Sequence, residues 1–241
     1  MKVDILQTVG SVVAEDYRTA VVFKQYGIDF CCGGGRSLEE TCRSKGIAVE
    51  EVQEKLESVQ QLEKQPDRLD FADWSLVLLS TYIEEKHHRY VRQVLPGISE
   101  FALKVARVHG QRHPETVEIW TCWQALAEEL SAHLRKEEQV LFPYVRLLES
   151  TNPPAAPFGS VANPIAMMTQ EHESAGALME NIRVLSSHFS PPEDACVTYR
   201  VLYQLLAEFE SDLHQHIHLE NNLLFPKALA QQQQVFAAVQ G

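Results

Sequence analysis

The feature that most constrains the fold of this chain is an internal repeat with a displacement of 83 positions. A histidine, a glutamate four residues later and a Phe-Pro pair recur in the same order. The first copy is His133, Glu137 and Phe142-Pro143, and the second is His216, Glu220 and Phe225-Pro226 (216 − 133 = 83). A single histidine, His88, recurs as His172 with a displacement of 84. Such a repeat indicates two copies of one supersecondary unit, here a pair of helices.

The spacing of apolar residues predicts an all-α protein. Beyond residue 70, four long segments carry apolar residues at helical intervals, and strand-like alternation is nowhere sustained. With 45% hydrophobic and 22% charged residues, the chain can bury a core. No apolar run approaches the roughly 20 residues that span a bilayer. The sequence therefore predicts a soluble protein.

Charge and cysteine content narrow the partners and the compartment. The net charge of −12 disfavours nucleic acid and anionic membrane surfaces as partners. The N-terminus lacks the basic region and long apolar run of a secretory signal. Five cysteines, an odd number, argue against a disulfide framework and fit a reducing compartment. We therefore expect a cytoplasmic protein.

The sequence divides into a small N-terminal helical domain, residues 1–65, and a four-helix bundle, residues 70–230, with a linker at Gln65-Pro66-Asp67. The N-terminal domain contains the turn Cys31-Cys32-Gly33-Gly34-Gly35, and three consecutive glycines cannot continue a helix. Ser37 and Glu40 then form a capping box, which predicts a new helix beside the two cysteines.

Prolines and capping residues set the predicted limits of the long helices. These limits are Asp73 to Leu95, ending before Pro96-Gly97; Pro114 to Tyr144, after a shorter helical connection from Phe101 to Val108; a start at Asn163-Pro164, after a loop from Ser150 to Asn163; and Ser190-Pro191-Pro192-Glu193 to Ala230, followed by the polar tail Gln231 to Gln234.

Six side chains able to bind metal fall on the apolar faces of these helices. Residues four apart lie on one face of a helix, so each His–Glu pair of the repeat aims an imidazole and a carboxylate in one direction. Leucine and phenylalanine at the same spacing indicate that this direction is inward. The predicted ligands are His88, His133, Glu137, His172, His216 and Glu220.

Burying six such groups is costly unless something satisfies their lone pairs, and a pair of metal ions does so. Two bridging carboxylates and two imidazoles for each ion leave room for a bridging oxygen, as in di-iron bundle cores. Imidazole mixed with carboxylate suits iron or manganese and tolerates zinc. We predict two iron ions per chain, oxo- or hydroxo-bridged. The alternative, ordinary core His–Glu pairs, is disfavoured by the repetition.

Other polar residues of the bundle have two interpretations. His87, His214 and His218 are turned away from the predicted ligands and are expected at the surface. Glu129 lies one turn before His133, and Glu171 adjoins His172. Either glutamate is a hydrogen-bond partner of a ligand or a proton carrier, or else an ordinary solvated carboxylate.

The adjacent cysteines Cys31 and Cys32 are the second group of candidates. Adjacent cysteines seldom bridge each other, because the ring is strained. A helix N-terminus stabilises a thiolate, the form that binds metal or attacks disulfides, and a buried structural pair is the alternative. Cys42, Cys122 and Cys196 have no partner at a useful spacing and are expected to be core thiols.

Five segments of the chain carry a resemblance to a known family. They are Asp29-Phe30-Cys31-Cys32-Gly33-Gly34, Lys86-His87-His88 leading to Leu95-Pro96, His133-Leu134-Arg135-Lys136-Glu137 with Phe142-Pro143, Glu171-His172-Glu173, and His216-Ile217-His218-Leu219-Glu220-Asn221-Asn222 with Phe225-Pro226. In this order they resemble the iron-sulfur cluster repair di-iron proteins, the YtfE, ScdA and DnrN family, also called repair of iron centres proteins.

The resemblance implies a hemerythrin-like bundle with a non-haem di-iron centre on the same six ligands, and a cytoplasmic location. It also implies a stress-response role in restoring iron-sulfur clusters damaged by nitric oxide or oxidants. The family's cysteine pair falls on Cys31 and Cys32, and carboxylates near its metals fall on Glu129 and Glu171. Gly35 and the glutamine-rich tail depart from the family pattern.

Three functions are compatible with this sequence. As a repair factor, which we rank first, the protein would donate iron to apo or damaged iron-sulfur proteins. As an enzyme, it would reduce nitric oxide at the di-iron centre with an external electron donor. As a hemerythrin-like module, it would bind or sense oxygen or nitric oxide, a role that leaves the cysteine domain without a use. The sequence is also compatible with a homodimer.

Overall fold

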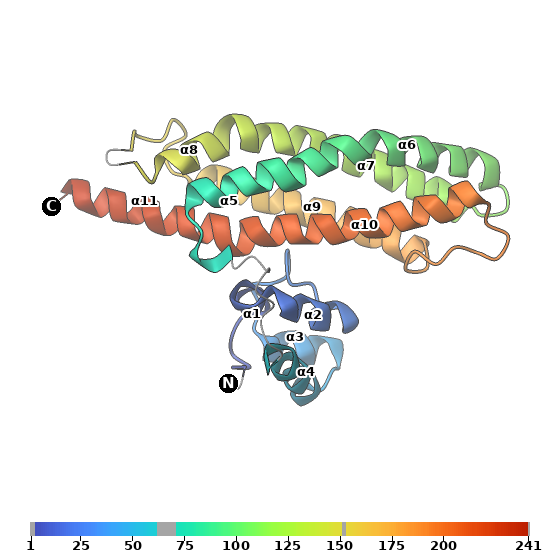
Figure 1. Ribbon diagram of the computed structural model, residues 1–241, viewed down its shortest axis with the longest axis horizontal. Helices are drawn as coiled ribbons and strands as arrows, with labels where there is room; N and C mark the ends of the chain where they lie inside the picture. The colour runs from blue at the N-terminus through green and yellow to red at the C-terminus, as the bar shows by residue number, and fades with distance from the viewer. Residues whose placement is uncertain (1–2, 62–70, 151–152, 241) are drawn as a thin grey trace. The chain divides into compact units, whose positions relative to one another are not determined.

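The computed structural model describes residues 3–61, 71–150 and 153–240, and this described part is helical without a strand (Figure 1). The prediction of an all-α protein is confirmed. Two compact units can be distinguished: residues 1–79 with 217–241, and residues 80–216. The boundary at His216 falls within one continuous helix. The predicted linker Gln65-Pro66-Asp67 lies outside the described residues, and the predicted domain limits 1–65 and 70–230 stay a prediction.

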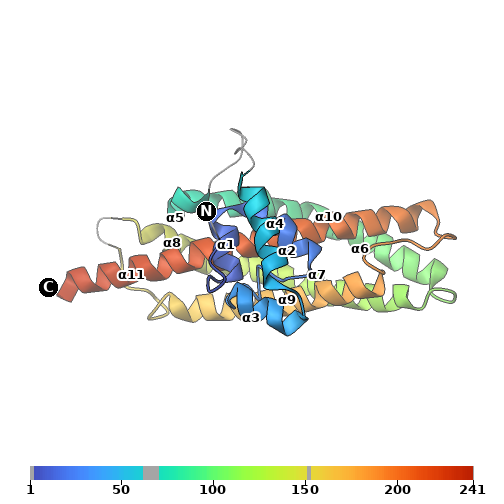
Figure 2. The same cartoon turned by 90° about the horizontal axis from the view of Figure 1, so that it is seen from below.

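The first unit contains the short N-terminal helices and the end of the chain (Figure 2). Its core includes the fully buried Val9, Phe23, Leu38 and Leu56. Ser37 accepts a hydrogen bond from the backbone N–H of Glu40 (3.2 Å) and begins α3, which confirms the predicted helix start. The helices of this unit are α1 (Val9–Glu15), η1 (Tyr17–Thr19), α2 (Ala20–Gln25), α3 (Leu38–Lys45), α4 (Val49–Gln61), η2 (Phe71–Asp73), and, at the end of the chain, η5 (Glu220–Leu224) and α11 (Phe225–Gln240).

The second unit is a bundle in which α6, α7, α9 and α10 run side by side (Figures 1 and 2). Trp123 lies at its centre, fully buried, with its ring 5.0 Å from that of Phe209 and its indole N–H donating to Ser99 Oγ (2.9 Å). The segments that form or enter this unit are α5 (Leu76–Tyr82), η3 (Ile83–His88), α6 (Arg89–His109), α7 (Glu115–Lys136), η4 (Glu137–Leu141), α8 (Phe142–Leu147), α9 (Ala162–Leu185) and α10 (Val197–Leu219).

Three turns of these long helices have π geometry, and each carries a predicted ligand. They are η3, which ends at His88, and η4 and η5, which begin at Glu137 and Glu220. The last two occupy residues 137–141 and 220–224, so the repeat of 83 positions extends to the backbone conformation. A π turn inserts one residue into an α-helix and occurs often at functional sites.

The predicted helix end before Pro96 is wrong, because α6 continues through this proline to His109. Pro96 is exposed, whereas Val91, Leu95 and Ile98 keep helical spacing and are buried against the bundle. Burial of this apolar face outweighs the one hydrogen bond that a proline removes. The predicted helical connection from Phe101 to Val108 is therefore the second half of α6.

The predicted limits of the last helices also need correction. Helix α10 begins at Val197, not at Ser190, because consecutive prolines keep the preceding residues out of the α conformation. Helix α11 continues beyond Ala230 to Gln240, as the good helix propensities of glutamine and alanine favour. Helix α9 begins at Ala162, one residue before the predicted cap. No helix in the described ranges combines the length and apolar character needed to cross a membrane.

Candidate metal centre

All six predicted metal ligands lie inside the long helices, and each is at most 2% exposed. The histidines belong to different elements: His88 ends η3, His133 lies in α7, His172 in α9 and His216 in α10. The two glutamates each begin the π turn that follows a histidine by four residues. The structure therefore brings together all six side chains that the spacing selected.

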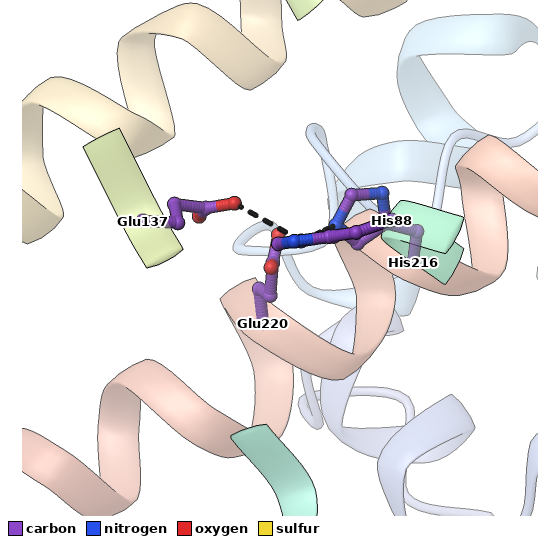
Figure 3. Close-up of side chains that lie close together, drawn as sticks. All are labelled: His88, Glu137, His216 and Glu220. Atoms are coloured by element: carbon purple, nitrogen blue, oxygen red, sulfur yellow. Dashed lines mark hydrogen bonds and ion pairs between the residues drawn. The ribbon is translucent and has the colours of Figure 1, made fainter. Parts of the chain in front are cut away.

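One set of four donors consists of His88, Glu137, His216 and Glu220, whose ligand atoms lie within 4.8 Å of one another (Figure 3). The Nε2 atoms of His88 and His216 are 3.2 Å apart. His88 Nε2 lies 3.4 Å from Glu137 Oε2. Figure 3 shows the four side chains pointing toward one another from η3, η4, α10 and η5. Glu220 lies one turn beyond His216 on a continuous helix, which fixes their relative positions.

The second set consists of His133, Glu137, His172 and Glu220, also within 4.8 Å of one another. The Nε2 atoms of His133 and His172 are 3.0 Å apart, and His133 Nε2 lies 3.2 Å from Glu137 Oε2. Glu137 and Glu220 belong to both sets. The geometry thus provides two neighbouring groups, each with two imidazoles, that share two carboxylates.

The far ring nitrogens of two of these histidines contact carboxylates. His88 Nδ1 lies 2.8 Å from Glu138 Oε1, and His133 Nδ1 lies 2.9 Å from Glu171 Oε2. A carboxylate can only accept here, so each Nδ1 carries the proton and each Nε2 presents its lone pair to the donor set. Glu171 is therefore a hydrogen-bond partner of His133, one of the possibilities considered for it. Sequence reasoning missed Glu138, which adjoins Glu137.

Both carboxylates have pKa values below the ordinary range. Burial alone would raise the pKa of Glu138, but hydrogen bonds from Arg92 and His88 outweigh burial and lower it. Burial opposes the shift in the same way at Glu171, where Lys136 and His133 lower the pKa. Both groups are therefore ionised acceptors for the histidine N–H groups at neutral pH.

Three other expectations for this region differ from the structure. His87 and His218 are not at the surface, since they are 0% and 1% exposed. His87 Nδ1 lies 3.0 Å from Asp212 Oδ1, and its ring stacks on that of His216 at 5.6 Å. Burial lowers the pKa of His218 to about 4. Cys196, expected in the core, is exposed, with its Sγ 3.2 Å from His109 Nε2.

Glu129 and His214 lie outside the two donor sets. Glu129 is exposed and accepts a hydrogen bond from Ser174 Oγ (2.8 Å), which favours the solvated interpretation of this residue. His214 is half-buried.

The cysteine loop, residues 29–35, forms a third group of possible donors. The Sγ atoms of Cys31 and Cys32 are 3.8 Å apart, and Cys31 Sγ lies 3.2 Å from Asp29 Oδ1. The Asp29 carboxylate accepts hydrogen bonds from the backbone N–H groups of Cys31, Cys32 and Gly33 (2.9, 3.0 and 2.8 Å). The ligand atoms of Asp29, Cys31 and Cys32 lie within 4.8 Å of one another.

The thiol of Cys31 is held in its protonated form. Its pKa is well above the ordinary value because of the hydrogen bond with Cys32, then burial, and then the negative charge of Asp29. A raised pKa favours the protonated thiol at Cys31, whereas a helix N-terminus would favour its thiolate. Only Cys32 of the pair is partly exposed.

The chemistry of the buried donors fits a pair of cations. Four imidazoles and two shared carboxylates, with no thiolate among them, form the nitrogen and oxygen set that suits iron or manganese. The glutamates Glu137 and Glu220 are each 0% exposed, and a buried carboxylate is stable only beside compensating positive charge or hydrogen-bond donors. Two divalent ions would supply that charge.

Comparison with known proteins supports this interpretation. Residues 79–228 match the hemerythrin HHE cation-binding domain, and residues 5–60 match the ScdA_N domain, described as a domain of unknown function. The chain is 35% identical to a probable iron-sulfur cluster repair protein of Haemophilus influenzae, over 86% of this chain and 90% of that protein.

Two further relatives cover still more of the chain. It is 36% identical to the iron-sulfur cluster repair protein YtfE of Pectobacterium atrosepticum, over 92% of this chain and 96% of the relative. The YtfE protein of an Escherichia coli strain is 35% identical over 93% and 97% of the two chains. The chain joins an ScdA_N domain to a hemerythrin cation-binding domain and belongs to the iron-sulfur cluster repair family.

Proposed function

We propose that this protein holds two iron ions and donates iron to iron-sulfur proteins whose clusters have been damaged by oxidants or nitric oxide. The observation that carries the proposal is the pair of buried donor sets that share Glu137 and Glu220. The names of the relatives supply the repair role. A cytoplasmic location and an apo or damaged iron-sulfur protein as recipient belong to the same proposal.

In this proposal His88 and His216 would hold one ion and His133 and His172 the other, while Glu137 and Glu220, which belong to both donor sets, would contribute to both. Iron held in this way is a store that can be given up for cluster reassembly. The residues of the chain determine how tightly it is held. Glu138 and Glu171 accept the Nδ1 protons and so orient two of the four imidazoles. Phe142 is fully buried and its ring stacks on that of His88 at 5.5 Å, so it would shield one side of this imidazole from water.

The test uses a purified iron-sulfur enzyme inactivated by nitric oxide. It is mixed without other iron with the iron-loaded protein, the iron-free protein, or the His133→Ala variant, which we expect to lose about one ion per chain. Recovery should follow the iron content of the added protein. His113→Ala, which removes a histidine paired with Asp194 outside the donor sets, is the control and should behave as wild type.

Two results would contradict the proposal. Equal recovery with iron-loaded and iron-free protein would exclude iron donation. Consumption of nitric oxide over many turnovers with a defined reductant, without recovery of the client enzyme, would favour the reductase alternative. Metal analysis gives an independent measure, because about two iron ions per chain are expected in wild type.

A further inference from the structure

The π turn η5 carries a proposed metal ligand and, directly after it, two asparagines that contact the cysteine loop. Asn221 Nδ2 donates to the backbone carbonyl of Cys31, and Asn222 Nδ2 donates to that of Phe30, each at 3.2 Å. All of these residues, with Glu220, belong to the first unit. Side-chain amides on two consecutive residues therefore join η5 to the cysteine loop.

His218 completes this contact. Its Nδ1 lies 3.0 Å from Asn222 Nδ2, and because an amide nitrogen only donates, the imidazole accepts. The His218 ring is buried beside the rings of Tyr17 and Phe30, at 5.5 and 6.0 Å. His218, Asn221 and Asn222 are called the amide clasp below.

Two glycines allow the backbone of the first unit to approach the clasp. A Cβ atom on Gly10 would lie 2.3 Å from Asn222 Oδ1, and one on Gly34 would lie 2.4 Å from the carbonyl oxygen of Phe30. The N–H of Gly10 donates to the carbonyl of Gly34 (2.8 Å). Helix α1 and the cysteine loop thus meet through backbone atoms beside Asn222, where side chains would not fit.

The internal repeat shows that ligand geometry does not require the clasp residues. The positions equivalent to His218, Asn221 and Asn222, 83 residues earlier, are Arg135, Glu138 and Gln139. Arg135 and Gln139 are exposed, and Glu138 contacts His88. Both copies nevertheless supply a histidine and a glutamate to the donor sets. The second copy therefore differs where the cysteine loop contacts it.

We infer that the amide clasp holds the cysteine loop against η5. Metal held by Glu220 then restrains the opening of the cysteine loop, which would expose the Cys31 thiol. The inference rests on the proposed metal centre. Fixing the Glu220 carboxylate limits movement of the next two residues, whose amides hold the loop. Loss of metal frees the turn, weakens both hydrogen bonds and raises the population of the open loop. Asn221 and Asn222 are positioning residues for the thiol pair.

The experiment measures the rate at which iodoacetamide labels Cys31 in the whole protein, by peptide mass spectrometry. Metal-free protein is compared with protein loaded with Mn²⁺, which prefers nitrogen and oxygen ligands to thiolate and so leaves the thiols uncovered. The exposed Cys196 is the internal reference. In wild type, Mn²⁺ should slow the labelling of Cys31 at least about fivefold, the low end of coupling between two sites.

Removal of Asn222, the central residue of the clasp, should abolish this dependence on metal. Without metal, Cys31 of Asn222→Ala should be labelled at least about fivefold faster than Cys31 of wild type, as expected for the loss of a net hydrogen bond. The rates of this variant with and without Mn²⁺ should be nearly equal. Asn221→Ala, which removes the hydrogen bond to the Cys31 carbonyl and leaves His218 its partner, should show a smaller change in the same direction. Gly10→Ala, which crowds Asn222 from the other side, should resemble Asn222→Ala.

The matched control is Gln139→Ala, at the repeat position equivalent to Asn222 and exposed to solvent. In this variant, the ratio of the Cys31 labelling rates without and with Mn²⁺ should equal that of wild type. A purely structural role of the clasp would speed labelling equally in both metal states, and that result would overturn the inference. Equal labelling rates of wild-type Cys31 without and with bound Mn²⁺ would also overturn it. If the protein binds Mn²⁺ and supports cluster repair but labelling does not change, only the inference about the clasp is contradicted. If the protein binds no metal, the proposed function is contradicted.

Discussion

Each of His88 and His133 contacts a carboxylate through the ring nitrogen that faces away from the donor sets. Glu138 and Glu171 hold these rings in the tautomer that presents Nε2 inward. Partners of this kind affect metal binding although they never touch the metal. At the scale of single residues, the candidate metal centre therefore includes these two carboxylates as well as its six donors.

We predict that Glu138→Gln weakens metal binding by about 10- to 100-fold, because the amide no longer provides a charged acceptor for His88 Nδ1–H. Competition with a chelator of known affinity measures the change. Glu128→Gln, an exposed glutamate of α7, is the control and should leave affinity unchanged. Equal affinities for both variants would show that Glu138 does not orient His88.

A second prediction concerns His113, whose pKa is raised first by its hydrogen bond with Asp194 and further by Glu115. A raised folded-state pKa means that this pair stabilises the fold below the ordinary histidine pKa of about 6.5 and loses this contribution as pH rises through the raised value. NMR titration of the His113 ring should show the raised midpoint. Asp194→Asn should return the His113 midpoint toward about 6.5. Glu193→Gln is the control and should leave the midpoint unchanged. An unchanged midpoint in Asp194→Asn would show that Asp194 does not raise the pKa of His113.

The six donors could be predicted from sequence because helical spacing alone decides which residues share a face. The burial of His87 could not, since it depends on Asp212 and His216 of another helix. The role of Glu138 depends likewise on His88, 50 residues earlier. Contacts between distant helices leave no periodic signal in a single sequence.

At the scale of elements, the π turns place the ligands relative to the apolar residues that follow. In η4, Glu137 begins the turn and Phe142 follows it, and both are fully buried. A regular α-helix over the same residues would rotate one of them away from the interior by about 100°. The additional residue of the π turn allows both to face the core.

We predict that deletion of Val140, an exposed residue within η4, abolishes metal binding at the donor sets while Val140→Ala preserves it. The deletion returns the turn to α geometry and rotates Glu137 relative to Phe142, whereas the substitution removes only two exposed methyl groups. Metal analysis after gel filtration measures the result, with helical content by circular dichroism as the control for folding. Full metal content in the deletion variant would contradict this account of η4.

The limits of the elements were less predictable than their existence. Pro96 correctly signals a lost hydrogen bond, but the buried residues on either side of it keep α6 intact. The Pro191-Pro192 pair instead lies where the chain is exposed or half-buried, and α10 begins after it. Identical local signals thus had different outcomes because tertiary packing differed.

At the scale of the whole molecule, the donor sets collect ligands from all four long helices of the bundle. Metal binding should therefore stabilise the fold broadly. With free metal at about 100 times its dissociation constant, linkage adds about 2.7 kcal/mol, which raises Tm by roughly 5–10 °C for a chain of this size. Calorimetry with and without a chelator measures the shift. His133→Ala should show a smaller shift, and an equal shift in this variant would place the bound metal elsewhere.

The repeat made the bundle and the grouping of its six donors predictable, because one supersecondary unit present twice needs few further assumptions. The cysteine loop could be recognised in the sequence, but its contact with η5 could not. That contact depends on Asn221 and Asn222, which follow a ligand motif and are unremarkable by composition. Only the difference between the two copies of the repeat distinguishes them.

Each donor set takes one histidine and one glutamate from the first copy of the repeat, and one histidine and one glutamate from the second. Neither copy alone can complete a site. If the backbone were cut by a protease between α8 and α9, bound cations would still connect the two fragments, as a crosslink does. Fragments produced from separate genes should accordingly associate more tightly with metal than without it, and removing the metal should favour their separation.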